Sequence, residues 1–124
     1  MSKKLLVVDD FNTMRRMVIK MLKELGFEDI VEAPDGAVAF DLLKENEIDL
    51  IISDWNMPNM TGIELLEKVR ATDGYQDTPF IMVTAEGQKE QVIEAVKKGV
   101  TGYIIKPFTA DVLKEKIADI FPDG

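Results

Sequence analysis

Five polar residues of this 124-residue chain lie at or just beyond the ends of short apolar runs: Asp9 and Asp10, Asp54, Thr84 and Lys106. Apolar runs of this length are typical of buried strands. Because the carboxyl ends of parallel strands lie at one edge of a sheet, we expect these five side chains to converge there. The convergence would bring together three carboxylates, one hydroxyl and one ammonium group.

Three carboxylates in such a space repel one another, and the pKa of at least one of them should be raised. A hard divalent cation relieves that repulsion. Carboxylate and carbonyl oxygens favour Mg²⁺, and the sequence, which has no cysteine and no histidine, offers no soft ligand. Mg²⁺ is therefore the expected cofactor.

A carboxylate beside a cation, a hydroxyl and an ammonium group can accept a phosphoryl group. We predict that Asp54 is the nucleophile and forms an aspartyl phosphate. Lys106 and the metal would balance the charge on the phosphoryl oxygens, and Thr84 would donate a hydrogen bond to one of them.

Each of these residues also has an ordinary structural interpretation. Asp54 could be a turn residue, and Asp9 with Asp10 could supply negative charge to the start of the next helix. Thr84 could cap a helix, and Lys106 could be a solvated loop residue. Their joint arrival at one sheet edge favours the chemical interpretation.

The bulk composition excludes several classes of function. The formal net charge is −8 and the sequence pI is near 4.5, which argues against nucleic acid as a ligand. No apolar run is long enough to span a membrane, and the N-terminus lacks a signal-peptide pattern. We expect one cytoplasmic domain over residues 1–124, without an effector domain.

Five apolar strands alternate with five helical patterns along the chain. The strands are too hydrophobic for period-two alternation, which is typical of a parallel sheet covered on both faces. We predict an α/β, doubly wound sheet of order 2-1-3-4-5, with a switch point between strands one and three. The expected strands are 5–8, 30–31, 50–52, 80–83 and 103–105.

Several local signals mark where the helices begin and end. Thr61 with Glu64 forms a capping box, and Thr109 can cap the last helix. Gly26 and Gly99 are placed to end the first and fourth helices. Apolar residues at helical spacing mark the first, second and fourth helices: Met14, Met17, Val18, Met21, Leu22 and Leu25 form one face of the first; Val38, Ala39, Leu42 and Leu43 mark the second; Val92, Ile93 and Val96 mark the fourth. In the third helix, Ile63, Leu66 and Val69 are expected to point inward.

The chain resembles the response-regulator receiver domains of two-component signalling over its whole length, and within that family the single-domain chemotaxis regulators. The stretches that carry the resemblance are 7–11, 13–16, 53–60, 82–86 and 102–109. The most specific of them are Trp55-Asn56-Met57-Pro58 and Lys106-Pro107-Phe108-Thr109. The resemblance implies the flavodoxin-like (βα)5 fold.

The resemblance also implies roles for individual residues. Asp54 would take its phosphoryl group from a histidine kinase, and Lys106 would contact that group. Asp10, Asp54 and the Asn56 backbone carbonyl would ligate Mg²⁺, with Asp9 acting mostly through water. The Lys106–Pro107 peptide bond is expected to be cis.

The resemblance further implies a switch and a partner surface. Thr84 and Tyr103 would form the switch pair. Asn56 and Glu86 would tune hydrolysis, giving a phosphorylated state that lasts seconds to minutes. Lys89, Val92, Tyr103 and Lys116 match positions that bind the flagellar motor switch, although Val92 also fits a helix core face. A mostly monomeric switch protein, not a classical enzyme, is expected, with a chemotaxis histidine kinase as partner and a dedicated phosphatase left open.

Three rival interpretations remain at this point. A phosphatase of the haloacid-dehalogenase type uses the same chemistry, but its nucleophile lies on the first strand in an Asp-x-Asp pattern. A flavin-binding module needs a phosphate-binding loop after strand one, where Asp9 and Asp10 would repel a phosphate. A receiver without an effector domain could also serve a phosphorelay instead of a motor.

Overall fold

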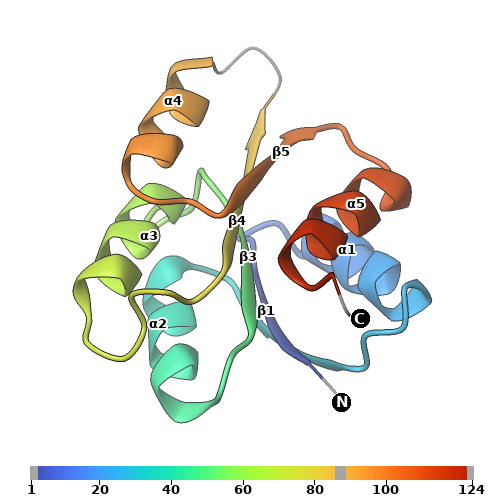
Figure 1. The fold of residues 1–124 in the computed structure, drawn as a ribbon, viewed down its shortest axis with the longest axis horizontal. Coiled ribbons are helices and arrows are strands. Elements are labelled where there is room, and N and C mark those ends of the chain that lie inside the picture. Colours follow the sequence, from blue (N-terminus) through green and yellow to red (C-terminus); the bar gives the residue numbers. More distant parts are fainter. Residues whose placement is uncertain (1–2, 86–88, 123–124) are drawn as a thin grey trace.

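The computed structural model describes residues 3–85 and 89–122 of the chain. Within these ranges, five strands and five helices alternate from the first strand to the last helix (Figure 1). In chain order they are β1 Lys4–Val8, α1 Asn12–Glu24, β2 Asp29–Ala33, α2 Gly36–Glu45, β3 Leu50–Asp54, α3 Gly62–Ala71, β4 Phe80–Ala85, α4 Lys89–Lys97, β5 Gly102–Lys106 and α5 Ala110–Ile120.

All neighbouring strands are parallel, and their order is β2-β1-β3-β4-β5. Helices α1 and α5 lie on one side of the sheet, and α2, α3 and α4 lie on the other (Figure 1). The doubly wound parallel sheet predicted from the apolar strands is confirmed, including its strand order. The β1 and β3 strands, at the switch point, lie side by side.

Each face of the sheet has its own apolar core. Alternate residues of a strand point to opposite faces, so β1 sends Leu6 and Val8 to one core and Leu5 and Val7 to the other. The first core is completed by α2, α3 and Ala95 of α4, and the second by α1 and α5. Burial on both faces explains why the strands are continuously apolar.

The cap signals of the sequence are confirmed. Thr61 and Glu64 form a reciprocal capping box at the start of α3, and the Thr109 side chain accepts a hydrogen bond from the Val112 N–H at the start of α5. Gly26 has a φ of 101° and Gly99 a φ of 91°, a left-handed conformation that glycine adopts without steric cost. Gly26 follows the C-cap residue of α1, Leu25, and Gly99 lies two residues beyond the last residue of α4.

The inward residues predicted for α3, Ile63, Leu66 and Val69, are buried, but not every apolar residue at helical spacing in the other helices belongs to the core. Met17 is 47% exposed, Val38 39%, Ile93 47% and Val96 59%, so these side chains are not core residues. In α4 the fully buried residue is instead Ala95. Helical spacing identifies apolar residues on one side of a helix, but the width of the covered stripe depends on which neighbours the fold supplies.

None of the described helices is both long enough and apolar enough to cross a membrane.

Candidate functional site

The register of the sheet brings the ends of β1 and β3 together. Val8 of β1 pairs with Ser53 of β3, so the following residues, Asp9 and Asp54, are neighbours across the two strands. The β1 strand stops there because its chain turns into α1, whose first helical residue is Asn12. Two acidic residues from distant parts of the sequence therefore meet at the switch point of the sheet.

The other two predicted groups arrive from β4 and β5. Asp54 pairs with Val83, which places Thr84 one residue further along β4. Ala85 pairs with Lys106, the last residue of β5. The Lys106 Nζ lies 2.9 Å from Asp54 Oδ1, with the lysine side chain 27% exposed and the aspartate side chain 11% exposed. Asp54 and Lys106, which were expected to meet at this edge of the sheet, thus form a direct ion pair.

The alternation of side chains along the strands explains which groups face each other. Ile52 and Ile104 belong to the core under α1 and α5, and Asp54 and Lys106 lie two residues beyond them on the same face. Met82 belongs to the opposite core, so Thr84 faces the α4 side of the sheet.

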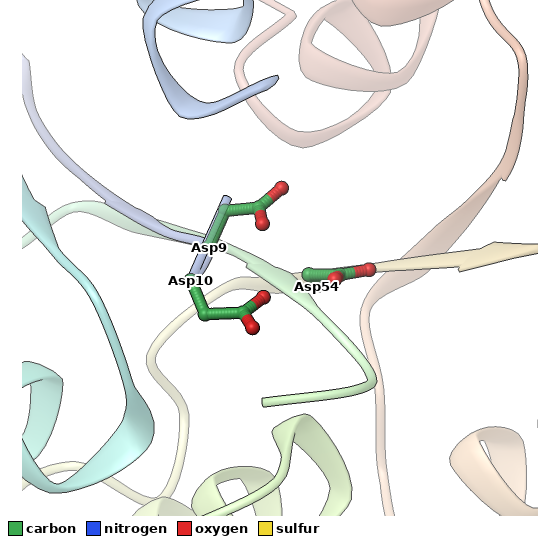
Figure 2. A group of neighbouring side chains, drawn as sticks. All are labelled: Asp9, Asp10 and Asp54. Carbon is green, nitrogen blue, oxygen red and sulfur yellow. The ribbon is translucent and has the colours of Figure 1, made fainter. Parts of the chain in front are cut away.

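Three carboxylates form the centre of the site. Asp9, Asp10 and Asp54 each offer an oxygen, and these oxygens all lie within 4.8 Å of one another. Figure 2 shows Asp9 and Asp10 extending from the end of β1, with Asp54 beside them at the end of β3. Asp9 and Asp54 are buried and Asp10 is exposed, so one side of the cluster is open to solvent.

The donor set of this cluster suits a hard divalent cation. All three groups are carboxylates, and one face is left for water or a substrate oxygen, as Mg²⁺ requires. Burial raises the pKa of the Asp9 carboxyl above its usual value, and the negative charges of Asp54 and Asp10 raise it further. The hydrogen bond from the Phe11 N–H and the charge of Lys106 act in the opposite direction. The raised pKa predicted for one member of the cluster is therefore found at Asp9.

Thr84 is fully buried, and its hydroxyl has no hydrogen-bond partner among the described residues. Tyr103 pairs with Met82 on the neighbouring strand, so its side chain shares the α4 side of the sheet with Thr84. A buried hydroxyl without a partner is costly unless another state of the protein satisfies it.

The loop after β3 carries Asn56, which is exposed. The Trp55 N–H donates to the Val83 carbonyl at 3.1 Å, and the Trp55 carbonyl accepts from the Gly62 N–H at 2.8 Å. These bonds hold the chain on the N-terminal side of Asn56. The backbone carbonyl of Asn56 is thus placed on a loop that leaves the sheet beside Asp54.

The four predicted partner-surface residues lie on α4, β5 and α5. Lys89 is exposed, and Val92, Tyr103 and Lys116 are half-buried. The Lys116 ammonium lies 5.4 Å from the centre of the Tyr103 ring, so the structure brings these two together. Glu86, predicted to tune hydrolysis, lies outside the described residues. The Lys106–Pro107 peptide bond is cis, as the resemblance implied.

The structure shows contacts of two residues to which the sequence assigned no role in the site. The Arg15 side chain donates a hydrogen bond to the backbone of Asp9, and the Asp35 carboxylate joins the start of α2 to the loop after β3 through Asn59. The helical pattern gave no signal for Arg15, whose partners are set by the tertiary structure. In the sequence, Asp35 with Gly36 indicates only a turn.

Comparison with known proteins agrees with this geometry. Residues 5–118 match the response regulator receiver domain family. The chain is 55% identical over 122 residues to the chemotaxis protein CheY homolog of Campylobacter jejuni, covering 98% of this chain and 94% of that protein. It is 52% identical over 118 residues to the chemotaxis protein CheY of Pseudomonas aeruginosa, covering 95% of each chain.

The fold is also similar to solved structures. The chemotaxis response regulator CheY4 of Vibrio cholerae superposes with a TM-score of 0.88 at 36% sequence identity, covering 97% of this chain and 99% of that one. The chain therefore belongs to the response regulator receiver domain family. Within that family it is a chemotaxis receiver of the CheY type. Receivers of this type are signalling switches rather than classical enzymes.

Proposed function

We propose that this chain is a phosphorylation-activated switch of two-component signalling. A histidine kinase of the chemotaxis system would donate a phosphoryl group to Asp54, and the phosphorylated protein would bind the flagellar motor switch to control rotation. The observation that carries the proposal is the Asp54–Lys106 ion pair of 2.9 Å inside a cluster of three carboxylates.

The residues of the site suit each part of the transfer. A carboxylate oxygen of Asp54 attacks phosphorus as the bond from phosphorus to the donor histidine nitrogen breaks, and the electron pair of that bond stays on the histidine. Lys106 balances negative charge on the phosphoryl oxygens and is held at the site by its contact with Asp54. Asp10, Asp54 and the Asn56 carbonyl would hold Mg²⁺, with Asp9 acting mostly through water. When bound, the cation neutralises the charge that builds up on the phosphoryl oxygens.

Activation would proceed through Thr84 and Tyr103. The Thr84 hydroxyl, which has no partner among the described residues, would donate to a phosphoryl oxygen. Its movement would allow the Tyr103 ring, on the same side of the sheet, to turn inward. The change would then reach Lys89, Val92 and Lys116 on the surface formed by α4, β5 and α5.

Asn56 and Glu86 would set the lifetime of the phosphorylated state. Asn56 is exposed beside the nucleophile, where its side chain can orient a water. We expect the purified protein to lose its phosphoryl group within seconds to minutes, and a dedicated phosphatase could shorten that time further. Loss of radiolabelled phosphate from the purified protein measures this lifetime, and a half-life of many hours would contradict it.

The proposal places the protein in the cytoplasm as a mostly monomeric single receiver domain. Beryllofluoride, which mimics a phosphoryl group on a carboxylate, tests the motor role. The treated protein should co-precipitate with the flagellar switch protein, and Asp54→Ala should abolish that binding. Binding that does not change with beryllofluoride would contradict the motor role and favour a phosphorelay. Multiple turnover on a small phosphomonoester would instead favour a phosphatase.

A further inference from the structure

The Arg15 side chain forms three hydrogen bonds beside the carboxylate cluster and is only 11% exposed. Its Nη1 donates to the backbone carbonyl of Asp9 at 2.7 Å, and its Nε donates to Glu32 Oε1 at 2.7 Å. Its Nη2 donates to Asn12 Oδ1 at 2.6 Å. One guanidinium therefore joins the end of β1, the end of β2 and the first turn of α1.

The Asp9 carbonyl belongs to the peptide group that links Asp9 to Asp10. The Asp9 N–H donates to the Ala33 carbonyl at 3.1 Å, and Asp9 Oδ1 accepts from the Phe11 N–H at 2.9 Å. Together with the bond from Arg15, three atoms of Asp9 are fixed. The plane of the following peptide group, and with it the direction in which Asp10 leaves the chain, is then fixed as well.

Asp10 needs this support more than the other two acidic residues. It is exposed, and within the described ranges no hydrogen bond or ion pair holds its carboxylate. Asp9 is held by Phe11, and Asp54 is held by Lys106. The position of the Asp10 carboxylate beside Asp9 and Asp54 thus depends on the backbone to which Arg15 is hydrogen-bonded.

The contribution of Arg15 is geometric rather than electrostatic. The Glu32 carboxylate lies 2.7 Å from the guanidinium and balances its charge. A positive charge near the site would in any case repel a metal cation, so loss of that charge alone should tighten metal binding. The planar guanidinium can bond three acceptors at once, which a lysine ammonium in the same place cannot reproduce with the same geometry.

We propose that Arg15 is a positioning residue for divalent-cation binding, holding the Asp9–Asp10 peptide so that the Asp10 carboxylate stays beside Asp9 and Asp54. The proposal rests on the metal site of the proposed function. Mg²⁺ requires near-ideal octahedral geometry and tolerates little displacement of a ligand. Replacing a residue that orients a metal ligand without binding the metal itself typically lowers metal affinity by about 10- to 100-fold.

The test is a Mg²⁺ titration followed through the fluorescence of Trp55, the single tryptophan of the chain and the neighbour of Asp54. Arg15→Ala should raise the Kd for Mg²⁺ by about 10-fold or more. Arg15→Lys, which keeps the charge and most of the side-chain packing, should raise it by about 3-fold or more because the three-acceptor geometry is lost. The matched control is Arg16→Ala, which removes the same group from the next, exposed position and should leave the Kd unchanged.

A second readout separates positioning from folding. With acetyl phosphate as donor, the Mg²⁺ concentration that gives half-maximal phosphorylation should rise in the Arg15 variants, while the rate at saturating Mg²⁺ should stay near that of the unmodified chain. A residue that only stabilised the fold would lower the melting temperature in EDTA and leave the Kd of the folded protein unchanged.

Three results would overturn the Arg15 assignment while leaving the proposed metal site intact. The first is a Kd for Mg²⁺ in Arg15→Lys that lies within about twofold of that of the unmodified chain. This variant should fold even if Arg15→Ala does not. Tighter Mg²⁺ binding in either Arg15 variant would show that only charge matters. Equal weakening in Arg16→Ala would show that the effect is not specific. If the unmodified chain itself gave no Mg²⁺ response, the proposed metal site would fail and the Arg15 assignment with it.

Discussion

Asp35 joins two elements that flank the site, and its replacement gives a sharp test of how the site is held. Its Oδ1 accepts a hydrogen bond from the Val38 N–H at 2.9 Å and caps α2, and its Oδ2 accepts from the Asn59 side chain at 3.0 Å. Asn59 lies on the loop after β3 that also carries Asn56. Asp35→Ala should therefore destabilise the domain and loosen this loop.

The two contacts set the size of the effect. Loss of an N-cap costs about 1 kcal/mol. A buried hydrogen bond to a charged group contributes more than about 1 kcal/mol to stability. Because Asn59 is exposed, its hydrogen bond to Asp35 is expected to contribute only about 1 kcal/mol. The free energy of unfolding at pH 7 should thus fall by about 2 kcal/mol. For a domain of this size the melting temperature should fall by about 6–10 °C.

Urea denaturation of four proteins measures the prediction: the unmodified chain, Asp35→Ala, Asn59→Gly and the double variant. Glycine is chosen at position 59 because Asn59 has a φ of 67°, where alanine would be strained. A coupling free energy of about 0.5–1 kcal/mol is expected between the two positions. Strict additivity, or a loss below about 0.5 kcal/mol in Asp35→Ala, would refute the reasoning.

The stabilisation that the Asp35 hydrogen bonds give the domain should depend on pH. Hydrogen bonds from Val38 and Asn59 lower the pKa of the Asp35 carboxyl below its ordinary value of 3.8. The unfolded chain therefore binds the proton more readily than the folded one, and the stabilisation is fully present above that value. It should be lost as the pH falls below 3.8 through the pKa of the folded state, so the difference between the unmodified chain and Asp35→Ala should narrow there.

Three further outcomes are expected. Mg²⁺ at about 100 times its Kd should stabilise the domain by about 2.7 kcal/mol, measured by thermal denaturation, and Asp10→Asn should remove most of that gain. In metal-free buffer, Asp54→Asn should lower the pKa of Asp9 because a nearby negative charge is removed. An NMR titration that follows the carboxyl carbon of Asp9 measures this change. Arg70→Ala should lower the free energy of unfolding, measured in urea, by about 2 kcal/mol. The Arg70 guanidinium donates to the Thr78 carbonyl just before β4, at 2.7 Å, and to the Gly99 carbonyl just after α4, at 2.9 Å. No loss of stability in that variant would contradict this role.

The sequence predicted the sheet edge well because its signals there are local. An apolar run that ends in a charged residue identifies both a strand and the group at its end, and parallel topology then brings Asp9, Asp54 and Lys106 together. The capping box of Thr61 and Glu64 is likewise contained within four residues. Such signals need no knowledge of the tertiary structure.

The errors and omissions have a common cause in tertiary contacts. Ile93 and Val96 have the spacing of core residues, but the fold leaves them exposed on α4. Arg15 belongs to an amphipathic helix like any other basic residue, and only the neighbouring β2 strand reveals its bond to Glu32. Asp35 was recognised as part of a turn, while its bond to Asn59, 24 residues away, was not foreseeable.

The most direct test of the central claim is phosphorylation of Asp54 itself. Purified protein should be incubated with acetyl phosphate and Mg²⁺ and examined by intact mass spectrometry, followed by peptide mapping after borohydride reduction of the acyl phosphate. We predict a mass gain of one phosphoryl group, located at Asp54, dependent on Mg²⁺ and absent in Asp54→Ala. A stable phosphoryl group on another residue, or equal labelling of Asp54→Ala, would contradict the account.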